Sequence, residues 1–310
     1  MKRVLITGGA GFIGSSLAEK LLSTGRYHVT LVDNLLTGEI RKVPVDPNCF
    51  FVNADVNRFE DIAPIMKAGS FDFVFHYAAV VGVQRTIDNP VMVLRDIDGI
   101  RNVLTLSKDT GVNRVFYSSS SEVYGEPVEM PQHEERTPLN SRLPYAVVKN
   151  VGESFCRSFY KEYGLPFGIF RFFNTYGPKQ STDFVISKFI RLALTNEDIP
   201  VYGEGSQTRT FCYITDNTEC TVQILEGKLV NNEVINIGSE IDVTILHLAE
   251  LIVRLTGSSS KIVFLPPLAE GDMTRRKPDV SKMKAILRHA PVSLEEGIRK
   301  ILEVGVPVAS

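Results

Sequence analysis

Short apolar segments alternate with longer amphipathic ones through the first half of the chain. Val4–Ile6 and Val29–Val32 are typical of buried strands, and residues 15–23 between them place Leu17, Leu21 and Leu22 on one helical face. The same pattern predicts a helix at Val93–Ser107 and four further strands, at Phe50–Val52, Phe73–His76, Arg114–Tyr117 and Phe167–Phe172. Strands that alternate with helices predict a parallel sheet covered on both faces. The continuous apolar runs within the strands agree with burial on both faces.

The pattern loosens after Pro178, where helical and strand segments mix with glycine-rich turns such as Gly203–Ser206. We therefore expect an α/β fold with a doubly wound parallel sheet in residues 1–178 and a smaller C-terminal substrate-binding lobe in residues 179–310. Val234–Ile237 is predicted as a buried strand, so that roughly residues 210–238 return to the first domain. Beyond Glu240 the pattern predicts a helix, a strand, a loop and further helices.

Composition excludes several classes of protein. The chain has 310 residues, of which 44% are hydrophobic, enough for about two domains. Its formal net charge of −2 does not favour nucleic acid or an anionic membrane as a partner, and no apolar run is long enough to predict a membrane-spanning helix. The four cysteines lack C-x-x-C spacing, which does not favour a metal site and is typical of reduced thiols in the cytoplasm.

A glycine-rich loop follows the first predicted strand and opens the first predicted helix. Gly8, Gly11 and Gly14 have the spacing G-x-x-G-x-x-G, with Phe12 and Ile13 between the last two. In that context the backbone N–H groups at the helix N-terminus bind a pyrophosphate, and the glycines allow its close approach. An ordinary strand-to-helix turn is the structural alternative. The loop favours a Rossmann-like dinucleotide-binding domain.

Acidic residues at the ends of the next two strands indicate which dinucleotide binds. Asp33 lies 19 residues after Gly14, close to the spacing expected of the carboxylate that bonds the ribose hydroxyls. Because a carboxylate repels a 2′-phosphate, NAD is favoured over NADP, and Asn34 is included in the predicted cofactor site. Asp55 and Val56 follow the third strand and are expected near the adenine. A helix cap is an equally good interpretation of Asp55.

Tyr145 and Lys149 are four residues apart and share one face of a helix. A free tyrosine has a pKa of about 10 and is a poor base at neutral pH, but a neighbouring ammonium lowers that pKa. Tyr145 is then able to take the proton of a sugar hydroxyl while a hydride leaves for NAD⁺, and both residues adjoin the cofactor. A surface Tyr/Lys pair is the alternative, which the glycine loop makes less attractive.

The chain resembles the extended short-chain dehydrogenase/reductases that act on nucleotide sugars. The resemblance covers almost the whole chain and is carried by residues 7–14, 76–79, 118–125, 145–149, 171–178 and 202–209. It implies an NAD-dependent nucleotide-sugar epimerase or dehydratase, with a UDP-sugar as the expected substrate. Since such enzymes return the hydride, NAD is expected to be a tightly held prosthetic group.

The resemblance also implies roles for individual residues. Ser120 matches the Ser or Thr that bonds the reacting C4 oxygen, and Ala78 belongs to a motif beside the cofactor. Asn174 matches an amide at the substrate diphosphate. Arg209 and Arg276 match arginines that bind the nucleotide phosphates, for which the planar guanidinium is suited because it bonds oxygens in pairs. A solvated basic turn is the alternative for Arg276.

Members of this family begin by oxidising a sugar hydroxyl, usually at C4, and then diverge. Glu122 matches a glutamate of decarboxylases and dehydratases, and a carboxylate beside the sugar suits proton transfer at C5. Ser121 matches uridine-sugar decarboxylases and guanosine-sugar dehydratases, whereas deoxythymidine-sugar dehydratases have an aspartic acid there. Residues 78–85 resemble epimerases instead. Arg85 in that segment is either a partner for a uronate carboxylate or a surface charge.

We therefore expect C4 oxidation with transient NADH, followed by decarboxylation of UDP-glucuronate or dehydration of an NDP-sugar. A UDP-sugar 4-epimerase is the alternative, and a non-catalytic protein that binds NAD and nucleotide sugars is a third. Family members commonly dimerise through two helices, here about Val93–Ser107 and Tyr145–Lys161, so a homodimer is implied. Leu104, Phe155 and Phe159 are apolar enough for that role or for the core. Residues 184–190 are expected to form a loop that shapes the sugar pocket.

Overall fold

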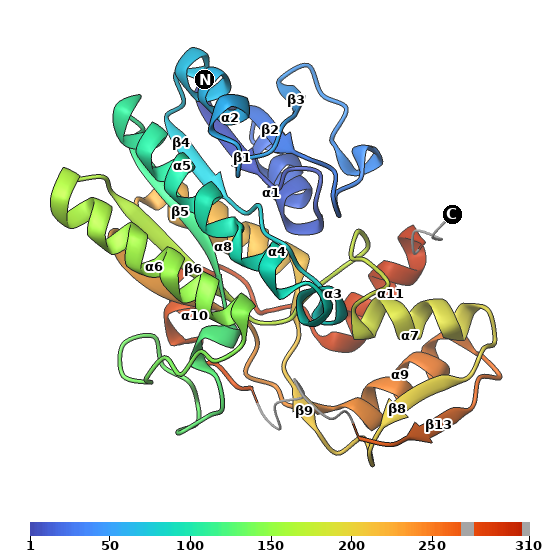
Figure 1. Ribbon diagram of the computed structural model, residues 1–310. Helices are drawn as coiled ribbons and strands as arrows, with labels where there is room; N and C mark the ends of the chain where they lie inside the picture. The colour runs from blue at the N-terminus through green and yellow to red at the C-terminus, as the bar shows by residue number, and fades with distance from the viewer. Residues whose placement is uncertain (268–275, 306–310) are drawn as a thin grey trace. The chain divides into compact units, whose positions relative to one another are not determined.

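The computed structural model describes residues 1–267 and 276–305 (Figure 1). They divide into two compact units. The first unit contains Met1–Gly125, Pro138–Phe172 and Thr218–Ile235. The second contains Glu126–Thr137, Phe173–Asn217 and the described residues from Asn236 onward. Residues 126–137 thus group with the second unit although they lie early in the chain.

Seven strands form one sheet in the order β11-β6-β5-β4-β1-β2-β3. From β3 to β6 all neighbours run parallel. The strands are β1 (Lys2–Thr7), β2 (Tyr27–Asp33), β3 (Cys49–Asn53), β4 (Phe73–His76), β5 (Arg114–Ser120), β6 (Phe167–Phe172) and β11 (Glu233–Ile237). The six strands predicted in the first half of the chain and the doubly wound parallel sheet are confirmed, and β11 covers the strand predicted at 234–237.

Helices follow the strands as the pattern predicts. They are α1 (Phe12–Ser23), α2 (Phe59–Gly69), α3 (Val83–Asp88), α4 (Pro90–Leu94), α5 (Asp96–Asp109), α6 (Pro144–Tyr163) and α8 (Ile214–Gly227), with the 3-10 helices η1 (Ile40–Lys42) and η2 (Ser121–Tyr124). The helix predicted at 93–107 is confirmed from Asp96 onward by α5, but Val93 and Leu94 belong to α4, because the chain divides at Arg95. There Arg95 N donates to Met92 O, and Asp98 N donates to Arg95 O. Hydrogen bonds between residues three apart are those of the tighter 3-10 helix.

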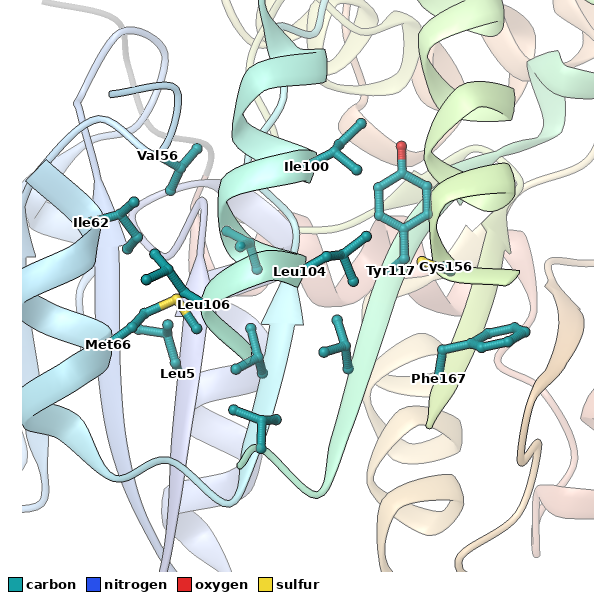
Figure 2. Packing of buried hydrophobic residues seen from close by; sticks show 14 of the residues in the cluster. Leu5, Val56, Ile62, Met66, Ile100, Leu104, Leu106, Tyr117, Cys156 and Phe167 are labelled. Atoms are coloured by element: carbon teal, nitrogen blue, oxygen red, sulfur yellow. The ribbon is translucent and has the colours of Figure 1, made fainter. Parts of the chain in front are cut away.

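The core of the first unit lies between the sheet and helices α5 and α6. These two helices pack side by side against β4 and β5 (Figure 1). Figure 2 shows Tyr117 of β5 between Ile100 and Leu104 of α5 and Cys156 of α6, all of them buried. α6 has Pro144 at its first position and ends at Gly164 in the left-handed conformation, the arrangement that favours a well-bounded helix. Tyr145 and Lys149 lie in the first two turns of this helix.

The second unit contains smaller elements. Three two-stranded sheets pair β7 (Thr175–Tyr176) with β10 (Cys212–Tyr213), β9 (Thr208–Arg209) with β12 (Val243–Thr244), and β8 (Ile199–Tyr202) with β13 (Ile262–Leu265). Its other helices are α7 (Val185–Leu194), α9 (Ile245–Thr256), α10 (Ser281–Ile286) and α11 (Leu294–Val304). The loop expected at 184–190 is wrong. Ile186, Phe189 and Ile190 are buried at three- and four-residue spacing, the pattern of one face of a helix.

The sheet topology defines where a ligand binds in this fold. Because β1 to β6 are parallel, their carboxyl ends meet at one edge of the sheet, and the strand order reverses between β1 and β4. Ligands of doubly wound sheets lie outside the carboxyl ends at that reversal. The glycine loop follows β1, Asp33 ends β2, and Ser120 ends β5, so the predicted site residues of the first unit gather at this edge.

Candidate cofactor and active site

The glycine loop is packed too closely for side chains. Gly8 has φ of +69°, and a Cβ added there would lie 2.8 Å from the backbone nitrogen of Ala78. A Cβ added at Gly14 would lie 2.3 Å from the carbonyl oxygen of Gly8. Gly11 N donates to that same oxygen at 3.1 Å, and α1 begins at the next residue, Phe12, followed by Ile13. The loop therefore presents backbone at the N-terminus of α1, which fits a pyrophosphate.

Asp33 joins the end of β2 to the glycine loop. Its Oδ2 accepts from Ala10 N at 3.0 Å, and its Oδ1 accepts from Leu35 N at 2.8 Å. Burial raises the pKa of Asp33, while these two backbone N–H groups act in the opposite direction. Asn34 beside it is exposed, and its Oδ1 accepts from Leu36 N at 3.0 Å. A carboxylate anchored here has the place that a ribose-binding residue requires in this fold.

Asp55 and Val56 lie in a turn that follows β3. Asp55 Oδ1 accepts from Asn57 N at 2.9 Å. The helix-cap interpretation of Asp55 is wrong, because α2 begins at Phe59 and its N-cap residue is Arg58. Val56 is buried, and its carbonyl oxygen accepts from Asn102 Nδ2 at 3.0 Å. Both residues are thus held at the carboxyl edge of the sheet, where the adenine was expected.

Thr7 organises the adjacent ends of β1 and β4. Its Oγ1 accepts from Tyr77 N at 3.1 Å and from Ala78 N at 3.2 Å, and it lies 2.8 Å from His76 Nδ1. A hydroxyl oxygen that accepts twice donates its own hydrogen, so Nδ1 of His76 is the acceptor and Nε2 carries the proton. Burial and the positive charge of Lys149 lower the pKa of His76 to about 3. The imidazole is therefore neutral at physiological pH.

The structure brings Tyr145, Lys149 and the end of β5 together. Tyr145 lies in the first turn of α6, half-buried against the core. One turn later Lys149 is buried, and its Nζ donates to Ser118 O at 2.7 Å and to Ser118 Oγ at 3.3 Å. The same nitrogen lies 5.7 Å from the centre of the Tyr145 ring and 5.3 Å from that of Tyr117. A cation is thus held beside the predicted proton-accepting phenol.

Burial lowers the pKa of Lys149 to about 8, and the negative charge of Asp96 acts in the opposite direction. Asp96 begins α5 and is itself buried, with its Oδ2 accepting from Val80 N at 2.7 Å. Burial raises the pKa of Asp96. The motifs did not indicate Asp96, since it is distant from Lys149 in the sequence and belongs to no recognisable spacing.

A tight turn follows β5 and carries the three other residues expected to act on the sugar. Ser120 is the N-cap of η2, and its Oγ accepts from Glu122 N at 3.2 Å. Ser120 and Ser121 are buried, whereas Glu122 is half-buried. Ser120 thus caps the backbone of η2 at the end of the strand. A hydroxyl that accepts one bond still carries a hydrogen to donate, so capping is compatible with contact to a substrate oxygen.

Three of the predicted substrate-binding residues belong to the second unit. Asn174 has φ of +33°. Its Nδ2 donates to Thr210 O at 2.9 Å, and Thr210 is the residue that follows Arg209. The guanidinium of Arg209 donates to Thr208 O at 2.8 Å. Arg276 is buried, and the next residue, Lys277, accepts a 2.7 Å bond from Gln132 N.

Arg85 belongs to the first unit, in α3. Its Nη1 donates to Val81 O at 2.7 Å, four residues earlier, and the side chain is half-buried. The guanidinium is therefore bonded to backbone just before the N-terminus of α3. Neither the role of a uronate partner nor that of a surface charge requires this position.

Arg171, which begins the 171–178 motif but was given no role of its own, pairs with Glu153, which lies outside every motif. They form the most deeply buried ion pair of the first unit's described residues. Arg171 Nε donates to Glu153 Oε1 at 2.8 Å, and Arg171 Nη2 donates to Glu153 Oε2 at 2.7 Å. Each residue is 1% exposed. The sequence did hold a signal, because Glu153 follows Lys149 by four residues and continues the helical face of Tyr145 by one more turn.

The described residues contain neither a membrane-spanning helix nor a cluster of metal ligands. Across residues 1–267 and 276–305, no helix combines the length and apolar character needed to cross a membrane. Over the same residues, no three or more His, Cys, Asp and Glu side chains are grouped so that they could hold a metal ion.

Comparisons with known proteins agree with the geometry. The model of the NAD-dependent epimerase/dehydratase family matches residues 4–238. A UDP-N-acetyl-α-D-glucosaminuronate decarboxylase of Bacillus cytotoxicus is 39% identical over 97% of each chain. A UDP-glucose 4-epimerase of Thermotoga maritima, solved with UDP-glucose, superimposes with a TM-score of 0.91 at 32% identity over 97% of each chain. A UDP-glucuronic acid 4-epimerase of Bacillus cereus, solved with UDP-glucuronic acid and NAD, gives 0.88 at 30% identity over 98% and 100%.

Proposed function

Because this chain belongs to the NAD-dependent epimerase/dehydratase family of enzymes, we propose that it oxidises a UDP-sugar at C4 and then removes a C6 carboxylate as CO₂. The observation that carries the proposal is the Lys149 ammonium, bonded to Ser118 O at 2.7 Å and 5.7 Å from the Tyr145 ring centre. This arrangement suits a phenol that must lose its proton. A protein that only binds nucleotide sugars has no need of it.

The glycine loop supports the assignment of NAD to the first unit. Gly8, Gly11 and Gly14 would hold the pyrophosphate, because side chains added at Gly8 and Gly14 would collide with backbone. Asp33 would bond the adenosine ribose, and Ala78, Tyr145 and Lys149 would border the nicotinamide. When bound, NAD supplies the acceptor for the hydride of sugar C4 and returns it at the end of the cycle.

The remaining residues act on protons and on the phosphates. Tyr145 removes the proton of the C4 hydroxyl, and Lys149 stabilises the resulting phenolate through its positive charge. Ser120 bonds the C4 oxygen. A C4 ketone makes a C6 carboxylate a β-keto acid, which loses CO₂ and leaves an electron pair at C5. Glu122 is assigned to the proton transfer at C5.

The second unit is assigned the nucleotide part of the substrate. Asn174, Arg209 and Arg276 would bind the diphosphate, for which Arg276 is notable because its charged side chain is buried. Guanidinium groups bond phosphate oxygens in pairs and are more weakly hydrated than an ammonium. The domain division follows, with cofactor and chemistry in the first unit and substrate recognition in the second.

A 4-epimerase is the second candidate. Residues 78–85 resemble epimerases, and both solved structures described above are 4-epimerases. Dehydration of an NDP-sugar is less favoured, because Ser121 is a weak proton donor to a leaving C6 hydroxyl. In an epimerase the same Tyr145, Lys149 and Ser120 act on C4, and Glu122 has no required part.

One experiment separates these reactions. The purified enzyme is incubated with UDP-glucuronate, UDP-N-acetylglucosaminuronate, UDP-glucose, deoxythymidine-diphosphate glucose and GDP-mannose, and products are analysed by mass spectrometry and proton NMR. Loss of CO₂ from a uronate supports the proposal. Unchanged mass with inverted C4 supports the epimerase, and loss of water supports a dehydratase. An enzyme with bound NAD that converts none of the five overturns the decarboxylase proposal for these substrates.

A cytoplasmic homodimer completes the proposal. The four cysteines are free thiols, which suits a reducing compartment. Leu104 is buried in the core, so of the three candidate interface residues only Phe155 and Phe159 on α6 are partly buried against it. Tyr160 and Tyr163 on the same helix are exposed. Light scattering on the purified protein tests the dimer, and a monomer at micromolar concentration overturns it.

A further inference from the structure

Helix α6 carries a buried glutamate on the face of Tyr145 and Lys149. Glu153 follows them at the next helical turn, and residues four apart lie one above the other on a helix. Glu153 is 1% exposed although it bears a carboxylate. A charge buried so deeply needs compensating bonds, and the identity of those bonds indicates its role.

The carboxylate of Glu153 is compensated by β6 and β5. Arg171 of β6 donates to both carboxylate oxygens, from Nε at 2.8 Å and from Nη2 at 2.7 Å. Ser119 of β5 donates from Oγ to Glu153 Oε1 at 2.7 Å. Since a buried ion pair often adds little net stability compared with apolar residues, the value of this one lies in the geometry that its paired bonds impose.

The remaining guanidinium nitrogen of Arg171, Nη1, contacts the turn after β5. It donates to the hydroxyl oxygen of Tyr124 at 2.8 Å, and the guanidinium lies 4.7 Å from the centre of the Tyr124 ring. Ser119 immediately precedes Ser120, and Tyr124 follows Glu122 by two residues. The turn 120–122 is therefore tied to the same ion pair on both sides.

We propose that Glu153 and Arg171, with Ser119 and Tyr124, form a positioning network that holds the 120–122 turn in register with the Tyr145 face of α6. The network acts through other residues and touches no substrate. The inference rests on the proposed function, because it assumes that the 120–122 turn and Tyr145 act on the sugar. It deepens that function by naming the residues that set the distance between the two groups.

The Tyr124→Phe variant tests the network, because it removes only the hydroxyl that Arg171 Nη1 contacts. We expect kcat to fall about tenfold or more, since small misplacements of catalytic groups have effects of this size. The KM for the nucleotide sugar and the NAD content after purification are expected to stay at wild-type values. A larger share of the enzyme is expected to hold 4-keto sugar together with NADH during turnover, because C5 chemistry lags behind C4 oxidation when the turn is displaced. Tyr160→Phe on the exposed part of α6 is the matched control.

Ser119→Ala approaches the turn from its other side and keeps the test decisive if Tyr124→Phe folds poorly. It removes one bond to Glu153 and leaves both bonds from Arg171. We expect the same lowered kcat at unchanged KM. If kcat in both variants equals that of wild type while only the melting temperature falls, the network is structural and the inference is overturned.

Tyr145→Phe separates this failure from failure of the proposed function. Full turnover by Tyr145→Phe would overturn the proposed function itself. Loss of turnover in Tyr145→Phe, with wild-type kinetics in Tyr124→Phe and Ser119→Ala, would leave the function in place and overturn the network alone.

Discussion

Lys149 Nζ donates a 2.7 Å hydrogen bond to the carbonyl oxygen of Ser118 while it lies 5.7 Å from the centre of the Tyr145 ring. One bond thus ties the helix that carries the phenol to the strand end that carries Ser120. The ammonium is buried and lies beside aromatic rings, so its attraction for a phenolate is screened less than it would be in water.

Asp96→Asn is expected to move the alkaline limb of the pH profile of kcat/KM to lower pH. The pKa of Lys149 is about 8, and the Asp96 charge raises it against the effect of burial. Without that charge the lysine loses its proton at a lower pH, so the ammonium that stabilises the phenolate is lost earlier. Profiles between about pH 6 and 10 check this. Asp98→Asn, on the exposed side of the same helix, is the control, and identical limbs in both variants would contradict the assignment.

Gly8→Ala is expected to lower the NAD content of the purified enzyme severely. Gly8 and Gly25 share φ of +69°, so alanine is strained at both positions. Only at Gly8 does the new Cβ meet backbone, 2.8 Å from Ala78 N, whereas nothing lies within 4 Å of the one at Gly25. Gly25→Ala therefore measures the strain alone, at about 1 kcal/mol or more. Equal NAD content in the two variants would argue against the loop as the cofactor cradle.

His76→Asn is expected to make the fold less sensitive to mild acid. The folded-state pKa of His76 is about 3 against an ordinary value of 6.5. Between these values the unfolded chain binds a proton that the folded chain does not, so wild-type stability falls as pH drops below about 6.5. At pH 5 the loss is about 2 kcal/mol, on the order of one proton's linkage.

Urea unfolding at pH 7 and pH 5 measures that difference for wild type and for His76→Asn, whose amide oxygen is able to accept from Thr7 as Nδ1 does. His28→Asn serves as the comparison, because it keeps His76. The same pH dependence in His76→Asn and wild type would show that the buried imidazole does not cause the acid sensitivity.

Arg276→Ala is expected to raise the KM for the UDP-sugar by about tenfold to a hundredfold, with a smaller effect on kcat. A rise of that size corresponds to the loss of charge-assisted hydrogen bonds to phosphate. Arg276 is buried, whereas Arg254 is exposed and pairs with Glu295. Steady-state kinetics of Arg276→Ala and Arg254→Ala make the comparison. Matching KM values would remove Arg276 from the substrate site.

Glu122→Gln is expected to abolish net turnover and to spare C4 oxidation. The amide keeps the size of the side chain but cannot transfer the C5 proton. Absorbance at the NADH band after a uronate substrate is added detects the oxidation, and mass spectrometry detects the missing product. Full activity of Glu122→Gln would leave the 4-epimerase as the better account.

The local pattern of the chain was sufficient for the parallel sheet, for the glycine loop that follows β1 and for the shared face of Tyr145 and Lys149. Each depends on periodicity or spacing over a few residues, which the sequence displays directly. The same kind of pattern was present in α7, where Ile186, Phe189 and Ile190 keep a helical spacing, although those residues were expected in a loop.

Other features depend on contacts between residues far apart in the chain, and only the tertiary structure decided them. Asp96 affects the charge of Lys149 from another helix, and Arg171 binds Glu153 across 18 positions of sequence. The spacing of Glu153 after Lys149 indicates its helical face but not its partner. The pairing itself leaves no periodic trace, because its energy comes from shared burial and from bond geometry that exists only after the strands and helices have packed. The sequence by itself determined which groups are available for chemistry, and packing determined which of them are held as charges beside the phenol.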